Sequence, residues 1–190
     1  MIYLFAKPIY IFVMALVLAI LEVQIEGGKG WAVNLPTWRP KEHKWYSQFY
    51  KKVMSGKEMT GYHLSMFSFV FLIFHLPFFS GASWSFAEEL KVWAIFFLFV
   101  VVWDYLWFVV NPFFTIKDFK GDHIFWHGKW IGNWPSDYWF SCFISLLLAI
   151  IVNFFFCPEY IIEWFIMFGV FIALTFITKI LIKKFKPEWE

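Results

Sequence analysis

The chain has 190 residues, of which 61% are hydrophobic and 26% aromatic, whereas only 16% are charged. Soluble domains are about half apolar and about a quarter charged, so this composition excludes an ordinary soluble protein and indicates a membrane protein. The net charge of +2 includes a single arginine, Arg39, which argues against nucleic-acid binding and bidentate phosphate recognition.

Five apolar runs, each about 20 residues long, predict membrane-spanning helices. They cover residues 3–25, 61–80, 86–110, 137–157 and 160–182. We therefore expect an all-α integral membrane protein, a five-span helical bundle that forms a single membrane domain over residues 1–190. The first run is too long for the apolar region of a signal peptide and lacks a small-residue cleavage site after it, so we interpret it as an uncleaved span.

Two span boundaries carry residues that favour helix starts. Ser85 is followed three residues later by Glu88, which has the form of a capping box before the third span. Either Ser136 or Asp137 can cap the fourth span.

The segment between the first two spans contains the stretch KEHKWYSQFYKKVM and predicts an amphipathic helix over about residues 40–56. Trp45, Phe49 and Val53 share one side of this helix, and Lys44 and Lys51 lie on the other. Such helices lie in the lipid interface. This one serves either as a membrane anchor alone or as a lid over a site at the same surface.

The basic residues predict the orientation. With five spans, residues 26–60, 111–136 and the C-terminal tail lie on one side of the membrane, and they contain 14 of the 16 basic residues. Only Lys7 and Lys91 lie on the other side. The positive-inside rule therefore predicts an outside N-terminus, a cytoplasmic C-terminus and mostly cytoplasmic loops, in the inner or plasma membrane of the cell.

Ionisable residues within spans are costly and indicate functional sites or buried ion networks. Glu22 and Glu26 are four residues apart near the end of the first span, so they share a helical face. His123 and His127 also share a face if the loop over residues 111–136 is helical there. The predicted topology places six such residues at the cytoplasmic surface: Glu22, Glu26, His63, Asp104, His123 and His127.

Three kinds of partner can neutralise the buried carboxylates. A metal ion is the first, because oxygen and imidazole ligands without thiolates suit iron or zinc, and also manganese. Protonation of the carboxylates in an apolar setting is the second. The third is an ion network with lysines, for which the sequence offers Lys29, Lys117, Lys120 and Lys129.

For the metal interpretation we assign Glu22, Asp104, His123 and His127 as metal ligands. Glu26 and His63 are then either the catalytic acid–base pair or further ligands. The expected function is a membrane-embedded metalloprotein, a metal-dependent oxidoreductase or hydrolase that acts on a lipid-soluble small molecule at the cytoplasmic leaflet.

Two other functions remain open. The chain can be an accessory structural subunit that packs against partner membrane subunits, with the polar cluster as a buried ion or hydrogen-bond network. It can also be a small transporter or proton-relay protein with Glu22 and Asp104 as relay carboxylates. His75 has no imidazole at the same depth on another span, which argues against haem, and we expect it to be a hydrogen-bonded structural residue.

Overall fold

The computed structural model describes residues 2–114, 118–121 and 123–185, and these residues are mostly helical. The helices are α1 (Ile2–Glu26), α2 (Trp45–Val53), α3 (Gly61–Phe79), α4 (Phe86–Val110), α5 (Ser136–Phe155) and α6 (Tyr160–Phe185). A short antiparallel pair, β1 (Trp130–Ile131) and β2 (Trp134–Pro135), directly precedes α5.

Five of these helices, α1, α3, α4, α5 and α6, are long and apolar enough to cross a membrane. Their bounds agree with the predicted spans to within one helical turn. The predicted all-α, five-span bundle is therefore confirmed. Helix α2 is shorter than the predicted amphipathic segment, and it buries none of its residues.

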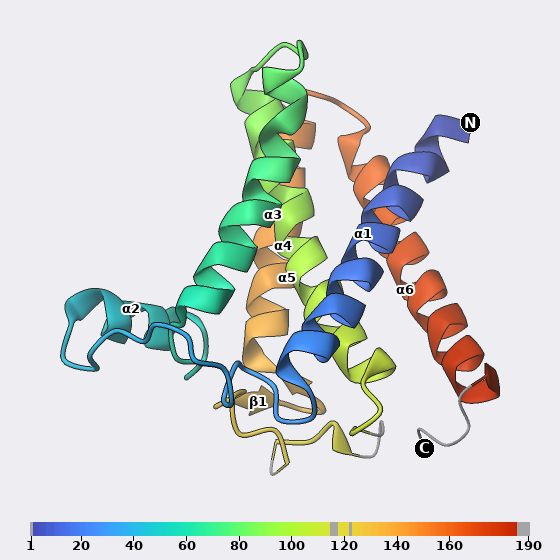
Figure 1. The fold of residues 1–190 in the computed structure, drawn as a ribbon. Helices are drawn as coiled ribbons and strands as arrows, with labels where there is room; N and C mark the ends of the chain where they lie inside the picture. The colour runs from blue at the N-terminus through green and yellow to red at the C-terminus, as the bar shows by residue number, and fades with distance from the viewer. Residues whose placement is uncertain (1, 115–117, 122, 186–190) are drawn as a thin grey trace.

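Helix α4 lies at the centre of the bundle and contacts α1, α3, α5 and α6 (Figure 1). It buries side chains from Ala94 to Val110, along most of its length. The outer faces of the surrounding helices expose large apolar side chains, for example Leu72 on α3 and Phe154 on α5. Apolar side chains on the outside of a bundle are expected of helices that contact lipid.

Helix α3 lies at the periphery and buries only His63 and Val70. Aromatic side chains attach it to α4. The rings of Phe74 and Phe99 are 5.2 Å apart between centroids, and those of Phe67 and Trp103 are 5.5 Å apart, both in edge-to-face geometry. Such pairs favour a defined packing orientation beyond the area that they bury.

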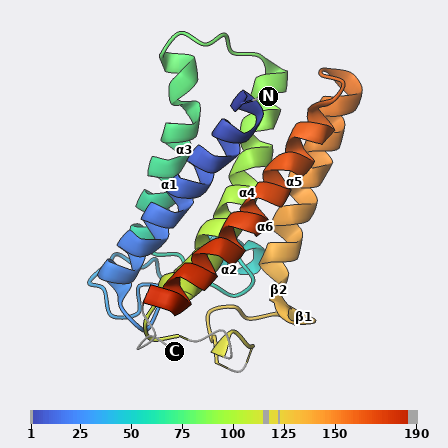
Figure 2. The same ribbon diagram turned by 90° about the vertical axis from the view of Figure 1, so that its right-hand side faces the viewer.

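The buried glutamate, lysine and histidine residues, Glu22, Glu26, Lys57, His63 and His127, lie at one end of the bundle. Helices α1, α4 and α6 end there, α3 and α5 begin there, and α2 and the β1–β2 pair lie at the sides of this end (Figures 1 and 2). We call this the polar end, the lower end in Figure 1. Helix α1 begins at the opposite end, because five spans place the start of the first helix and the end of the last helix at opposite ends of the bundle.

The two capping predictions have different outcomes. The Ser85 hydroxyl accepts a hydrogen bond from the Glu88 backbone N–H at 3.2 Å, so the cap of α4 is confirmed. The prediction for α5 was wrong, because its N-cap is Pro135 and no side chain caps it. The Ser136 hydroxyl instead pairs with that of Ser55 at 2.8 Å, and Asp137 forms ion pairs at the polar end.

Candidate functional site

Glu22 and Glu26 continue the buried stripe of α1. The stripe includes Ile11, Ala15 and Leu18 at helical spacing, and both glutamates are only 7% exposed. Two carboxylates buried on one face of a helix need compensating partners, because an isolated buried charge is strongly unfavourable.

The loop that follows α1 folds back over these glutamates. Gly30 has a φ of +58°, and a Cβ at this position would lie 2.8 Å from the Trp126 ring, so only glycine fits here. Trp31 and Ala32 continue the turn with φ values of 47° and 51°. The turn allows the Ala32 backbone N–H to donate a hydrogen bond to Glu26 Oε1 at 2.5 Å.

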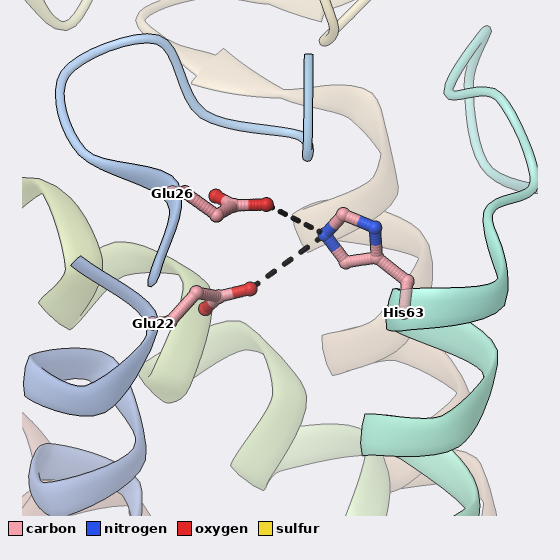
Figure 3. Close-up of side chains that lie close together, drawn as sticks. All are labelled: Glu22, Glu26 and His63. Atoms are coloured by element: carbon pink, nitrogen blue, oxygen red, sulfur yellow. Dashed lines mark ion pairs between the residues drawn. The ribbon is translucent and has the colours of Figure 1, made fainter. Parts of the chain in front are cut away.

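His63 approaches both glutamates from the first turn of α3 (Figure 3). Its Nε2 lies 3.3 Å from Glu26 Oε1 and 3.6 Å from Glu22 Oε1. Thr60 caps α3 by accepting the His63 backbone N–H, and its hydroxyl also pairs with His63 Nδ1 at 2.8 Å. The Trp31 ring stacks on the imidazole, with 3.8 Å between centroids. The ring is thus fixed with Nε2 directed at the carboxylates.

These three side chains, which we call the Glu–Glu–His cluster, have the geometry of a metal site. One ligand atom from each of Glu22, Glu26 and His63 lies within 4.8 Å of the others. Ligands about 2.1 Å from one ion are roughly 3–4 Å apart, and the two distances from Nε2 fall in this range. A divalent cation with two carboxylates and a neutral imidazole would leave no net charge. The Nδ1 contact with Thr60 is the outer support that metal-binding histidines normally have.

A second cluster contains Lys57, Asp104, His127, Asp137 and Tyr138, and we call it the lysine network. Lys57 Nζ lies 2.9 Å from Asp137 Oδ2 and 3.4 Å from Asp104 Oδ1. His127 contacts the same two carboxylates, with Nδ1 3.3 Å from Asp137 Oδ1 and Nε2 3.2 Å from Asp104 Oδ2. The Tyr138 hydroxyl donates a further hydrogen bond to Asp104. Both carboxylates are therefore compensated within the protein.

A close backbone contact holds together the two chain segments that carry Lys57 and His127. The Gly128 backbone N–H donates to the Ser55 carbonyl at 2.8 Å, and a Cβ on Gly128 would lie 2.6 Å from that oxygen. Only glycine permits this contact. It brings the segment carrying His127 against the segment that carries Lys57.

The charge of Lys57 is maintained although the side chain is only 3% exposed. Burial lowers the pKa of Lys57, but the Asp104 and Asp137 carboxylates outweigh this effect and raise the pKa above its ordinary value of 10.5. Lys57 is therefore a cation at neutral pH. Its Nζ also lies 4.8 Å from the centroid of the Trp31 ring, which connects the two clusters.

A cavity of about 220 Å³ adjoins both clusters. Its polar wall is formed by Glu22, Lys57, His63, Asp104 and Asp137. Its apolar wall extends between α3, α4 and α5 and includes Phe67, Phe96, Phe97, Val100, Val101 and Phe140. Helix α2 and the residue after it contribute Tyr50, Val53 and Met54, so this segment covers part of the cavity.

The structure brings five of the six sequence-predicted residues into these clusters, Glu22, Glu26 and His63 into one and Asp104 and His127 into the other. His123 lies elsewhere. Its side chain is 48% exposed, and its Nδ1 is 3.5 Å from Asp118 Oδ1. Around the two histidines the described residues form turns instead of a helix, so the four-residue spacing does not place both imidazoles on one face.

Sequence reasoning missed several partners. Asp137 was interpreted only as a helix cap, and Lys57 was not considered as a partner of Asp104. Thr60 carries a recognisable signal, because a threonine directly before a span is a typical N-cap. Among the lysines that were considered, Lys117 lies outside the described residues, and no ion pair to the six predicted residues is found for Lys29, Lys120 or Lys129 in the described part of the chain.

No family model, curated protein or solved structure matches this chain. Function is therefore inferred from the geometry of the two clusters and of the cavity that adjoins them.

Proposed function

We propose that the chain is a membrane-embedded metalloprotein in which Glu22, Glu26 and His63 hold an iron, zinc or manganese ion. The observation that carries the proposal is the convergence of His63 Nε2 on two buried glutamate carboxylates, with Nδ1 held by Thr60. Even with a protonated imidazole, two ionised carboxylates would leave this cluster with a net negative charge. A divalent cation supplies the missing charge.

The proposed activity is that of a metal-dependent oxidoreductase or hydrolase with a lipid-soluble substrate. Three protein ligands leave coordination positions open, as in catalytic metal sites. The bound ion would supply Lewis-acid or redox chemistry at the polar wall of the cavity. Glu22 and His63 line the cavity directly, so a substrate there lies beside the proposed ion.

Asp104 and His127 have a different role in this proposal from the one the sequence suggested. Lys57 and Asp137 already compensate them, so a metal ion there would have to displace an existing cation. We propose that the lysine network positions Asp104 at the cavity wall, where its ionised carboxylate can accept a hydrogen bond from the substrate. His123 takes no part.

Elemental analysis by mass spectrometry of the detergent-purified protein tests the metal site. We expect about one ion per chain in the wild type, and its loss in the Glu26→Gln and His63→Gln variants. The matched controls are Asp104→Asn and His127→Gln, which alter the lysine network and should retain the metal. Loss of metal in the control variants alone would favour the assignment based on sequence. Size-exclusion profiles and melting temperatures would show which variants remain folded.

An accessory structural subunit is the second candidate, and the closed lysine network favours it. A network in which each buried carboxylate already has cationic partners can hold helices together without catalysis. If the folded wild-type protein contains no metal and takes up none on reconstitution, this candidate replaces the enzyme. The search would then turn to partner membrane subunits.

A further inference from the structure

Two side chains that line the cavity carry buried hydrogen-bond donors without an acceptor among the described residues. The Trp103 indole N–H and the Tyr50 hydroxyl are inaccessible to solvent, and neither finds a partner among the described residues. Both side chains line the cavity, and Trp103 is only 3% exposed. Buried donors are nearly always satisfied in native proteins, so an acceptor on a ligand that enters the cavity can supply the partner that these two donors lack among the described residues.

The charges around the cavity restrict the kind of acceptor. Three carboxylates, those of Glu22, Asp104 and Asp137, line the cavity, against the cation of Lys57 and the imidazole of His63. Lys57 is already paired with two of the carboxylates, at 2.9 and 3.4 Å. An anionic head group would therefore be repelled and would find no uncommitted lysine.

The size and lining of the cavity restrict the remainder of the ligand. Its volume of about 220 Å³ lies below the 300–1,000 Å³ that is common for small-molecule sites. Along α4 the lining residues extend from Asp104 to Phe96, which corresponds to about 12 Å at 1.5 Å per residue. This part is apolar, with Phe67 and Val100 as further wall residues. One slender hydrocarbon chain fits these conditions.

We infer that the cavity binds a single-chain amphiphile whose uncharged head carries a carbonyl-type oxygen, which accepts hydrogen bonds from Trp103 and Tyr50. The chain lies along the apolar wall formed by Phe67, Phe96 and Val100. The head lies beside the Glu–Glu–His cluster, and the inference rests on the proposed function in so far as this ligand is the substrate of that site.

Photocrosslinking provides the test, with a long-chain ketone that carries a diazirine on its chain and an alkyne tag. The protein is treated with a chelator and placed in lipid nanodiscs, so that labelling does not require a metal. We expect crosslinks in the α3 and α4 segments that line the cavity. Unlabelled tridecan-2-one should compete at least tenfold better than dodecanoate or dodecane at neutral pH.

Conservative variants separate the hydrogen bonds from the packing. Trp103→Phe and Tyr50→Phe each remove one donor and retain a ring, so each should weaken competition by tridecan-2-one about three- to tenfold. The matched controls are Trp107→Phe and Tyr62→Phe. Both remove a polar atom that is also buried and unpartnered but does not line the cavity, and both should leave competition unchanged.

Equal competition in Trp103→Phe, Tyr50→Phe and the wild type would overturn the inference, as would stronger competition by dodecanoate or crosslinks outside the cavity. The proposed function is tested separately, by the metal content of the protein. A metal-free protein that binds the ketone would overturn the metal site alone, and a metal-loaded protein that ignores the ketone would overturn the ligand assignment alone.

Discussion

Lys57 is the residue whose replacement tests the lysine network most directly. It is the only lysine among the described residues that pairs with both Asp104 and Asp137. In Lys57→Met the two carboxylates retain only His127 and Tyr138, so we expect a loss of about 3 kcal/mol in the free energy of unfolding. Lys52→Met, an exposed change in α2, should cost less than about 0.5 kcal/mol. Unfolding titrations in mixed detergent micelles measure both values.

The same variant should change how stability depends on pH. The pKa of Lys57 is raised in the folded protein because the two aspartates outweigh the effect of burial. Its contribution is therefore complete below the unfolded-state pKa and is lost as the pH rises through the higher folded-state value. The wild-type melting temperature should fall towards that of Lys57→Met above about pH 10.5. A constant difference between the two proteins up to the highest pH tested would contradict this assignment.

Ser145 shows how single hydrogen bonds join the helices of the bundle. Its hydroxyl donates to the Ala94 carbonyl on α4 at 2.6 Å and accepts the Trp164 indole N–H of α6 at 2.8 Å. Ser145→Ala removes both bonds and leaves the Trp164 donor without an acceptor. Because bonds between membrane helices are worth about 0.6 kcal/mol on average and up to about 1.7, we expect a loss of about 1 kcal/mol.

The control for Ser145→Ala is Ser68→Ala, which changes an exposed serine on α3. It should leave the free energy of unfolding within about 0.5 kcal/mol of the wild type. Equal effects of the two substitutions, measured in the same micelles, would mean that the contact between α4, α5 and α6 depends on packing alone.

The five spans could be predicted from sequence because each is one long apolar run, a property of local composition. The gathering of Glu22, His63 and Asp104 at one end followed from the alternation of these spans. Their partners could not be predicted, because Lys57 reaches Asp104 only through a loop whose path depends on the contact between Ser55 and Gly128.

His123 and His127 show the same limit within one short segment. Their spacing had predictive value only if the segment was helical, and the described residues around them form turns. His127 is buried against two aspartates, whereas the His123 side chain is half exposed. The environment of His75 was easier to predict from the sequence, because this residue lies inside a regular helix. As expected, it is hydrogen-bonded, to the Phe71 carbonyl at 2.7 Å and to Glu89 at 3.1 Å.

The side of the membrane on which the cavity lies is a property of the whole molecule, and the distribution of lysines predicts the cytoplasmic leaflet. In a background in which Cys142 and Cys157 are replaced by alanine, Lys41→Cys places a thiol in the segment that joins α1 to α2 at the polar end, and Ser83→Cys places one in the turn between α3 and α4. A membrane-impermeant maleimide applied to intact cells should label Ser83→Cys at once. It should label Lys41→Cys only after the cells are permeabilised. The reverse pattern would place the Glu–Glu–His cluster at the outer leaflet, and a substrate would then have to reach it from outside the cell.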